Sequence, residues 1–446
     1  MKTLSQPGLS ELSTVLCTAL ILLIPLALAG ISLINTGLGR ARSAAHLMMS
    51  SLCVISVAAL VYFLCGFAWQ GFAGGPSHFI AIAGKEWSWI GAGPFFLRRL
   101  SSNHVSVSLT VMLGMLSVGL AAMIPLGSGA ERWRLGAACA STALLAGITF
   151  PIFAHWVWGG GWLAQLGVNY GLGEGFLDVG GSGSVQALGG LTALSIAWIL
   201  GPRHGKYTRD GMPSAIPGHN SVFVIVGCFF AMLGWIGLNG AGAILFTEAN
   251  PNRIVPIAIN TMLAAATAGL TGAVITKVRF GRPDASLTAN GWIGGLAASS
   301  AGCAYIEPAE AVAIGIVAGA LVIFSVEFLE LRLSLDDPGG SISAHAVGGI
   351  WGLLAAGFLA RFPAHVVDRI VYSPSAIPGQ LLAQLVGIAT LIGFVLPLTY
   401  GLNWLLNRYY PQRIAPEGER QGMDLHELGA GAYPEFLTHS EEFTQH

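Results

Sequence analysis

The chain has 446 residues, of which 54% are hydrophobic and only 10% charged, and its net charge is −1. Soluble domains carry about 25% charged residues, so this composition and a mean hydropathy of +0.68 exclude an ordinary soluble protein and place the chain in a membrane. The charge balance gives no indication of a nucleic-acid partner, and we expect none.

Apolar runs long enough to cross a bilayer, about 20 residues each, recur along the whole sequence. We expect an all-α polytopic membrane protein with eleven transmembrane helices in one membrane domain, residues 1–405, followed by a C-terminal tail, 406–446. The runs are 12–35, 45–68, 106–128, 134–157, 183–201, 220–246, 255–277, 286–304, 309–330, 342–361 and 379–405.

The first run has two readings. Lys2 followed by an apolar stretch with Ala27 and Ala29 near its end also fits a cleaved signal peptide. The stretch continues to Ile34 and is followed by Arg40 and Arg42, which favours a retained span.

Lys and Arg residues are distributed unequally between the two sides. Loops after odd-numbered spans, together with the tail, hold fourteen of the 21, and the remaining seven fall on the other side. Because basic residues accumulate in the cytoplasm, we expect an external N-terminus and a cytoplasmic C-terminus.

The fourth and fifth spans meet at a Trp and an Asp. Trp158 ends the fourth span and Asp178 precedes the fifth. An indole face beside a carboxylate can bind a small cation, so the pair predicts an external recruitment site. Alternatively, Asp178 only caps a helix start and Trp158 is an aromatic of the membrane interface.

A short repeat relates the fifth and tenth spans. Gln186-Ala-Leu-Gly-Gly matches His345-Ala-Val-Gly-Gly, which divides the chain into two five-helix halves plus an eleventh helix. Five spans is an odd number, so the second half enters the membrane from the opposite side. Inverted repeats of this kind place the substrate path near the midplane, where Gln186 and His345 are expected to face one another. The alternative for His345 is a satisfied structural histidine, although ionisable residues at membrane depth are by default functional.

Catalytic and cofactor motifs are not apparent. The sequence shows no Ser/His/Asp set, metal cluster or phosphate loop, and its six cysteines lie in apolar runs without CxxC pairing. We expect no enzymatic activity, no metal and no cofactor.

Several motifs, in order, resemble the Amt/MEP/Rh ammonium transporters over nearly the whole chain. They are AERWRL (130–135), AHWVWGGGWLAQLG (154–167), GFLDVGGSG (175–183), GWIGLNGAG (234–242), GRPDASLTANGWIGGLAASSAGCAYIEP (281–308), LDDPGGSISAHAVGGIWG (335–352) and GMDLHELGAGAY (422–433). The resemblance implies eleven spans in two inverted halves, a homotrimer with one pore per subunit in the cell (plasma) membrane, and often a tail that meets a PII-type regulatory protein.

Carried over residue by residue, the resemblance places ammonium recruitment at Trp158, with Asp178 as the required acid beside it. The family's two pore histidines fall on Gln186 and His345, so only the second is retained.

Other family positions have diverged. The two gate phenylalanines fall on Ser117 and Leu238, and the vestibule serine falls on Gly242. The acid usual two residues after Asp-Asp-Pro is Gly340, and the tail's His-Gly-Glu is replaced by residues 428–430, Leu-Gly-Ala.

These departures shape the predicted function. We expect transmembrane transport of ammonium or ammonia past the Gln186/His345 pair, with looser selectivity that admits small amines because both gate rings are lost. Two alternatives stay open: an ammonium or amine sensor that signals through its tail, and a channel for another small neutral solute.

Overall fold

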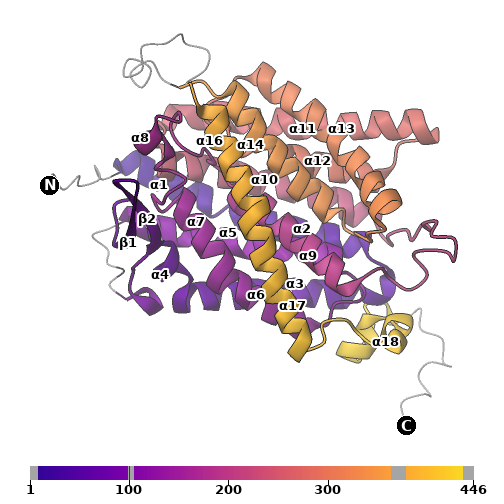
Figure 1. The fold of residues 1–446 in the computed structure, drawn as a ribbon. Coiled ribbons are helices and arrows are strands. Elements are labelled where there is room, and N and C mark those ends of the chain that lie inside the picture. The colour runs from indigo at the N-terminus through magenta and orange to yellow at the C-terminus, as the bar shows by residue number, and fades with distance from the viewer. Residues whose placement is uncertain (1–8, 99, 101–104, 363–377, 435–446) are drawn as a thin grey trace.

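The computed structural model describes residues 9–98, 100, 105–362 and 378–434. Lys2, Arg99 and Arg369, which entered the charge comparison, and the end of the expected tail, 435–446, lie outside the described residues. Figure 1 shows long helices running side by side in one bundle, with a small β-hairpin at one end and the C-terminal segment at the other.

Helices form most of the described chain. The α-helices are α1 (Glu11–Ile21), α2 (Ile24–Leu38), α3 (Ala44–Val61), α4 (Phe67–Gln70), α5 (Val105–Gly129), α6 (Leu135–Leu144), α7 (Phe150–Val157), α8 (Leu166–Tyr170), α9 (Leu188–Leu200), α10 (Ser221–Thr247), α11 (Ile254–Phe280), α12 (Ala285–Ser299), α13 (Pro308–Leu333), α14 (Gly348–Leu359), α16 (Gln380–Thr390), α17 (Leu396–Tyr409) and α18 (Pro416–Gln421). Short 3₁₀ and π-helical turns join them: η1 (Ala41–Ser43), η2 (Tyr62–Gly66), η3 (Phe95–Leu97), η4 (Leu145–Thr149), η5 (Ser182–Ala187), η6 (Pro251–Arg253), η7 (Ile342–Val347), η8 (Leu391–Val395) and η9 (Asp424–Leu428).

The expected all-α membrane class is confirmed. Within the described residues, ten continuous helical segments are long and apolar enough to cross a membrane, and each coincides with one of the predicted runs. The remaining run, 286–304, corresponds to α12, which has 15 residues and spans only about 22 Å at 1.5 Å per residue. Helix α12 packs against α11, α13 and α14, so neighbouring helices and not lipid surround much of it.

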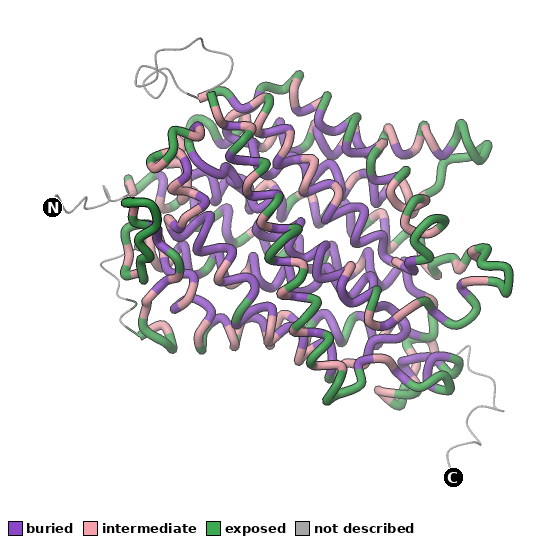
Figure 2. Tube along the Cα trace, in the orientation of Figure 1, coloured by how far each residue is buried: buried purple, intermediate pink, exposed green. Residues whose placement is uncertain are grey.

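Burial follows the pattern of a protein surrounded by lipid. Figure 2 shows buried stretches through the centre of the bundle and exposed turns along its outer helices. Large apolar side chains on that outer surface include Leu52, Leu270 and Phe328, which are 63%, 67% and 56% exposed. Helices satisfy their own backbone hydrogen bonds, so these faces can contact hydrocarbon without cost.

The two repeat segments cross by direct backbone contact. Each begins with a π-helical turn, η5 or η7, and continues as α9 or α14. A Cβ on Gly190 would lie 2.3 Å from the nitrogen of Ala346, and a Cβ on Gly349 would lie 3.0 Å from the nitrogen of Ala187. The two contacts join corresponding residues of the two repeats, since Gly190 corresponds to Gly349 and Ala187 to Ala346. In the same way, α9 packs on η7 and α14 packs on η5. The segments therefore run antiparallel, as an inverted repeat requires.

The connection between α4 and α5 contains a small sheet that the sequence did not predict. Strands β1 (Ser77–Ile82) and β2 (Lys85–Gly91) pair antiparallel. Trp156 donates its indole N–H to the carbonyl of Trp89 in β2 at 2.7 Å. The hairpin is thus fixed to the end of α7.

Carboxylates of the C-terminal segment bind two helix starts. Asp424 accepts hydrogen bonds from the backbone nitrogens of Ala45 and His46 at the start of α3, at 3.2 and 2.8 Å. Glu427 accepts from the nitrogen of Leu135 at the start of α6, at 2.8 Å, and contacts Nε2 of His46 at 2.7 Å. Anionic groups at helix N-termini are stabilising, so the described tail is docked on the bundle.

Candidate functional site

A vestibule of about 890 Å³ opens at the end of the bundle where η5 begins, and Trp158 and Asp178 both line it. The Trp158 ring stacks on Phe246, with centroids 4.8 Å apart and an angle of 9° between the planes. The indole N–H of Trp158 donates to the backbone carbonyl of Asp178 at 2.7 Å. The structure therefore brings the two predicted recruitment residues together and adds Phe246 as an aromatic wall. Phe246 could not be predicted from the sequence, because a single phenylalanine in an apolar span forms no pattern.

The two carboxylate oxygens of Asp178 differ in their hydrogen bonding. Its Oδ2 accepts from the backbone nitrogens of Gly183 and Ser184 at 3.1 and 2.7 Å, which is the helix-start arrangement expected of a capping acid. Its Oδ1 is buried and has no hydrogen-bond partner. Burial raises the pKa of Asp178 to about 6, although backbone hydrogen bonds act in the opposite direction. At neutral pH the side chain is therefore more often ionised than protonated, and its Oδ1 has unused acceptor capacity.

Gly242, expected at the vestibule, is not among the residues that line it. A Cβ on Gly242 would lie 2.2 Å from the carbonyl oxygen of Val179. The chain segment between Asp178 and η5 thus covers Gly242. A serine would not fit at this position without backbone movement.

Gln186 and His345 contact one another deep in the bundle. Nδ1 of His345 lies 2.8 Å from Oε1 of Gln186, and the two residues are only 4% and 0% exposed. An amide oxygen only accepts hydrogen bonds, so Nδ1 carries the hydrogen and Nε2 of the ring is left as an acceptor. Nε2 of Gln186 has no partner. The pair therefore presents one unused acceptor and one unused donor group.

The two gate positions are buried without aromatic rings. Ser117 is 0% and Leu238 1% exposed, and the Ser117 hydroxyl has no hydrogen-bond partner.

At the opposite end of the bundle, the space beside Gly340 is filled by the side-chain amide of Asn290, 2.1 Å from where a Cβ would stand. The acid missing at Gly340 is thus replaced in space by a neutral polar group.

The structure reveals that the repeat is longer than the five residues identified from the sequence. Residues 178–190, DVGGSGSVQALGG, match 337–349, DPGGSISAHAVGG. Asp337 accepts from the nitrogen of Ile342 at 2.8 Å, as Asp178 does from Gly183. The repeat thus includes the acid that precedes each segment as well as the glutamine and histidine.

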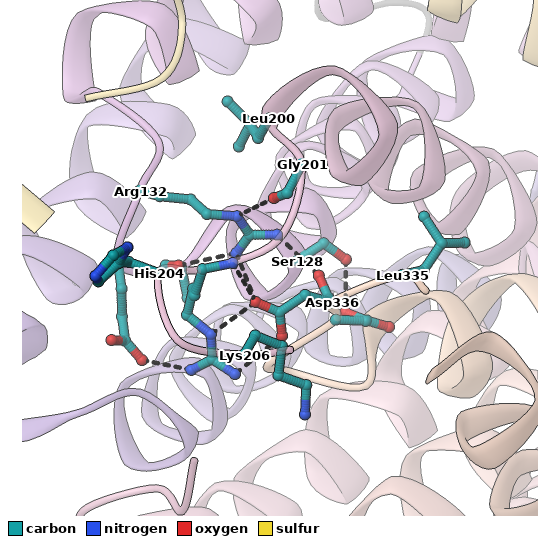
Figure 3. A network of polar contacts seen from close by, with 12 residues as sticks. Ser128, Arg132, Leu200, Gly201, His204, Lys206, Leu335 and Asp336 are labelled. Carbon is teal, nitrogen blue, oxygen red and sulfur yellow. Dashed lines mark hydrogen bonds and ion pairs between the residues drawn. The ribbon is translucent and has the colours of Figure 1, made fainter. Parts of the chain in front are cut away.

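Asp337 lies at the end of the bundle opposite to Asp178. The span 182–200 begins beside Asp178 and ends close to Arg203, which binds Asp336 with its Nε and Nη2 at 2.9 and 3.0 Å. Figure 3 shows this network, in which Arg132 also donates to the carbonyls of Gly201 and Asp336, at 2.7 and 2.8 Å. Burial alone would raise the pKa of Asp336, but the two guanidinium groups bring it below its ordinary value. This ion network fixes the end of the repeat interface that lies opposite to Asp178.

Metal-binding groups of three or more His, Cys, Asp or Glu side chains do not occur in the part of the chain that the structure describes. The candidate site is thus built from hydrogen-bonding groups, aromatic rings and carboxylates.

Comparison with known proteins identifies the family. The Ammonium Transporter Family model matches residues 13–433. The chain is 37% identical to ammonium transporter Amt2 of Archaeoglobus fulgidus over 424 residues, covering 92% of this chain and 85% of the relative. It is 30% identical to the ammonium transporter of Bacillus subtilis, covering 93% and 97%.

Solved structures agree. A structure named Sensor Amt Protein superposes with a TM-score of 0.81 at 28% identity, covering 93% of this chain and 98% of that one. Candida albicans Mep2 superposes with a TM-score of 0.75 at 26% identity, covering 96% and 92%. The chain is therefore an integral membrane protein that belongs to the ammonium transporter family.

Proposed function

We propose that this ammonium transporter takes up its substrate at the vestibule of Trp158 and Asp178 and passes neutral ammonia between the two halves, beside Gln186 and His345. The observation that carries the proposal is the buried Gln186–His345 contact of 2.8 Å at the repeat interface. Gln186 belongs to η5, the same helical turn whose first backbone nitrogens donate to Asp178.

The energetics favour splitting the ion. Burying an isolated cation in a low-dielectric interior costs several kcal/mol even after relaxation, and tens of kcal/mol in the Born limit. Deprotonating an amine-like ion with a pKa near 10.4 at pH 7 costs only about 4 to 5 kcal/mol. A narrow apolar passage thus selects ammonia and rejects Na⁺ and K⁺, which have no proton to release.

The amide changes the proton chemistry. Two facing imidazoles could relay a proton, since each ring nitrogen can donate or accept. Gln186 takes no proton in the accessible range and already accepts from His345. We therefore infer that ammonia crosses without net charge.

Labelled ammonia and methylammonium flux in proteoliposomes, with and without a membrane potential, tests this proposal. We expect saturable flux that does not depend on the potential, and no ammonium-evoked current on a solid-supported membrane. A large current carried by the wild type, unchanged in Gln186→His, would contradict electroneutral passage.

Orientation, location and partners extend the same proposal. The fourteen-to-seven distribution of Lys and Arg supports an external N-terminus and vestibule and a cytoplasmic tail. The family resemblance supports insertion in the plasma membrane. The family resemblance supports a homotrimer and a PII-type partner at the tail. Residues 428–430, Leu-Gly-Ala, replace the usual tail motif. A pull-down of a PII protein, with the tail intact and truncated, tests whether binding is retained.

A sensor is the second candidate function. It is favoured by the TM-score of 0.81 with the structure named Sensor Amt Protein and by the tail's bonds to the starts of α3 and α6. Complementation of a strain that lacks ammonium uptake, beside amine binding to the purified protein, separates the two. Binding without flux would identify a sensor.

A further inference from the structure

A small cavity at the inner end of the bundle contains the repeat mate of the vestibule acid. The cavity holds about 130 Å³, which is room for a small ion or water molecules. Its polar lining consists of Arg203, Lys206, Glu330, Asp336, Asp337 and Ser343.

One acid of this lining has no basic partner. Lys206 is paired with Glu330, and Asp336 is paired with Arg203 at 2.9 Å and faces Arg132 at 3.9 Å. The Asp337 carboxyl is bound by neutral donors, the hydroxyl of Ser128 at 2.6 Å and the backbone nitrogen of Ile342 at 2.8 Å, and burial raises its pKa. Each of its oxygens keeps further acceptor capacity. Asp337 therefore has no Lys or Arg partner among the described residues, and a bound cation would supply one.

The second, independent feature is an unused hydroxyl. Ser343 is 0% exposed, lines this cavity, and its Oγ has no hydrogen-bond partner. Buried polar groups are nearly always paired, and an unpaired one calls for an explanation such as a ligand. In the outer half the corresponding hydroxyl, that of Ser184, is likewise buried and without a partner, two residues before Gln186 as Ser343 is two residues before His345.

We propose that the inner cavity binds one small monovalent cation of the ammonium class, with the Asp337 carboxylate and the Ser343 hydroxyl as acceptors. The ligand class rests on the proposed function, but the site itself stands on the cavity, the Asp337 carboxyl without a basic partner and the unused hydroxyl. Ammonium has N–H donors for both groups. Ammonia that has crossed takes a proton from the solution on this side, opposite to Trp158, to form the ion; in the reverse direction the bound ion returns that proton before ammonia enters.

Ser343→Ala is the decisive variant because it removes a hydroxyl that holds nothing in the fold. Flux of labelled methylammonium is measured in right-side-out and inside-out vesicles, with Ser184→Ala as the matched control from the other half. We expect Ser343→Ala to raise the half-saturating concentration about tenfold for entry from the inner face only, as loss of one hydrogen bond to a charged group implies. Ser184→Ala should leave entry from that face unchanged.

A structural measurement decides the site if the wild type carries no flux, which would refute transport and not the site. Crystals soaked in thallium(I), an ion of ammonium-like size, should show anomalous density between Asp337 and Ser343, reduced in Ser343→Ala and competed by ammonium chloride. Thallium density that potassium chloride displaces but ammonium chloride does not would overturn the ligand class. Absence of thallium density, or equal effects of Ser343→Ala on both faces, would overturn the site.

Discussion

The charge of Asp178 should control uptake as the external pH falls. Its pKa of about 6 makes it roughly 90% ionised at pH 7 and roughly 10% ionised at pH 5. Ammonium stays protonated over this range, so the fraction of vestibules able to attract the cation falls about ninefold. We expect the half-saturating concentration of methylammonium to rise by a similar factor.

Asp178→Asn isolates this effect. The asparagine oxygen can still accept from the nitrogens of Gly183 and Ser184, so the start of η5 is preserved while the charge is lost. A unit charge about 4 Å from a cation contributes at most about 4 kcal/mol at an effective dielectric constant of 20, and partial hydration reduces this. At least a tenfold weaker uptake at pH 7 is therefore expected, with little further change down to pH 5.

Initial rates in proteoliposomes with the internal pH held constant provide the measurement. Glu174, Glu248 and Glu307 also line the vestibule and remain in the variant, so it shows directly what they contribute. If wild type and Asp178→Asn lost uptake in parallel between pH 7 and pH 5, Asp178 would not be the titrating group and the reasoning would fail.

Three further predictions follow from other parts of the structure. Gly190→Ala should destabilise the protein by at least about 1 to 3 kcal/mol, because its Cβ would lie 2.3 Å from the nitrogen of Ala346; Gly393→Ala, with nothing within 4 Å, is the control in a thermal melt. Glu427→Gln should weaken tail docking by about 1 kcal/mol, seen as faster limited proteolysis after Tyr410. Burial opposes ionisation of Glu427, but the His46 contact and the Leu135 nitrogen lower its pKa overall. The stabilisation of the docked tail by Glu427 is therefore present above about pH 4.3 and is lost as the pH falls through the lowered pKa. A tail equally protected from proteolysis at pH 3 and pH 7 would refute this. Loss of both gate rings should let ethylammonium pass, and exclusion as strict as in a relative that keeps both phenylalanines would contradict a wider entrance.

Features set by hydropathy and symmetry were predictable. Apolar length located the spans to within a few residues, because lipid demands about 20 apolar residues per crossing. The match between Gln186 and His345 indicated that these side chains meet, because an inverted repeat superposes corresponding positions at one interface. The structure places their polar atoms 2.8 Å apart.

Features set by side-chain and backbone packing could not be predicted from the sequence. Helix α12, with 15 residues, is shorter than the predicted run 286–304 with which it coincides. Gly242 was assigned to the vestibule by analogy with a serine, whereas its environment is fixed by the carbonyl of Val179. Phe246 and the β-hairpin depend on contacts between distant segments, which a single sequence does not display.

The glycine crossings have a mechanical consequence. Where Gly190 meets Ala346 and Gly349 meets Ala187, the two backbones are in direct contact, without a layer of side chains between them that could change rotamer. Such a joint resists sliding, so the halves are poorly suited to rocking between outward-open and inward-open shapes. The transport rate would then be set by diffusion of ammonia through a protein that does not change shape. The rate would depend only weakly on temperature, like that of a pore.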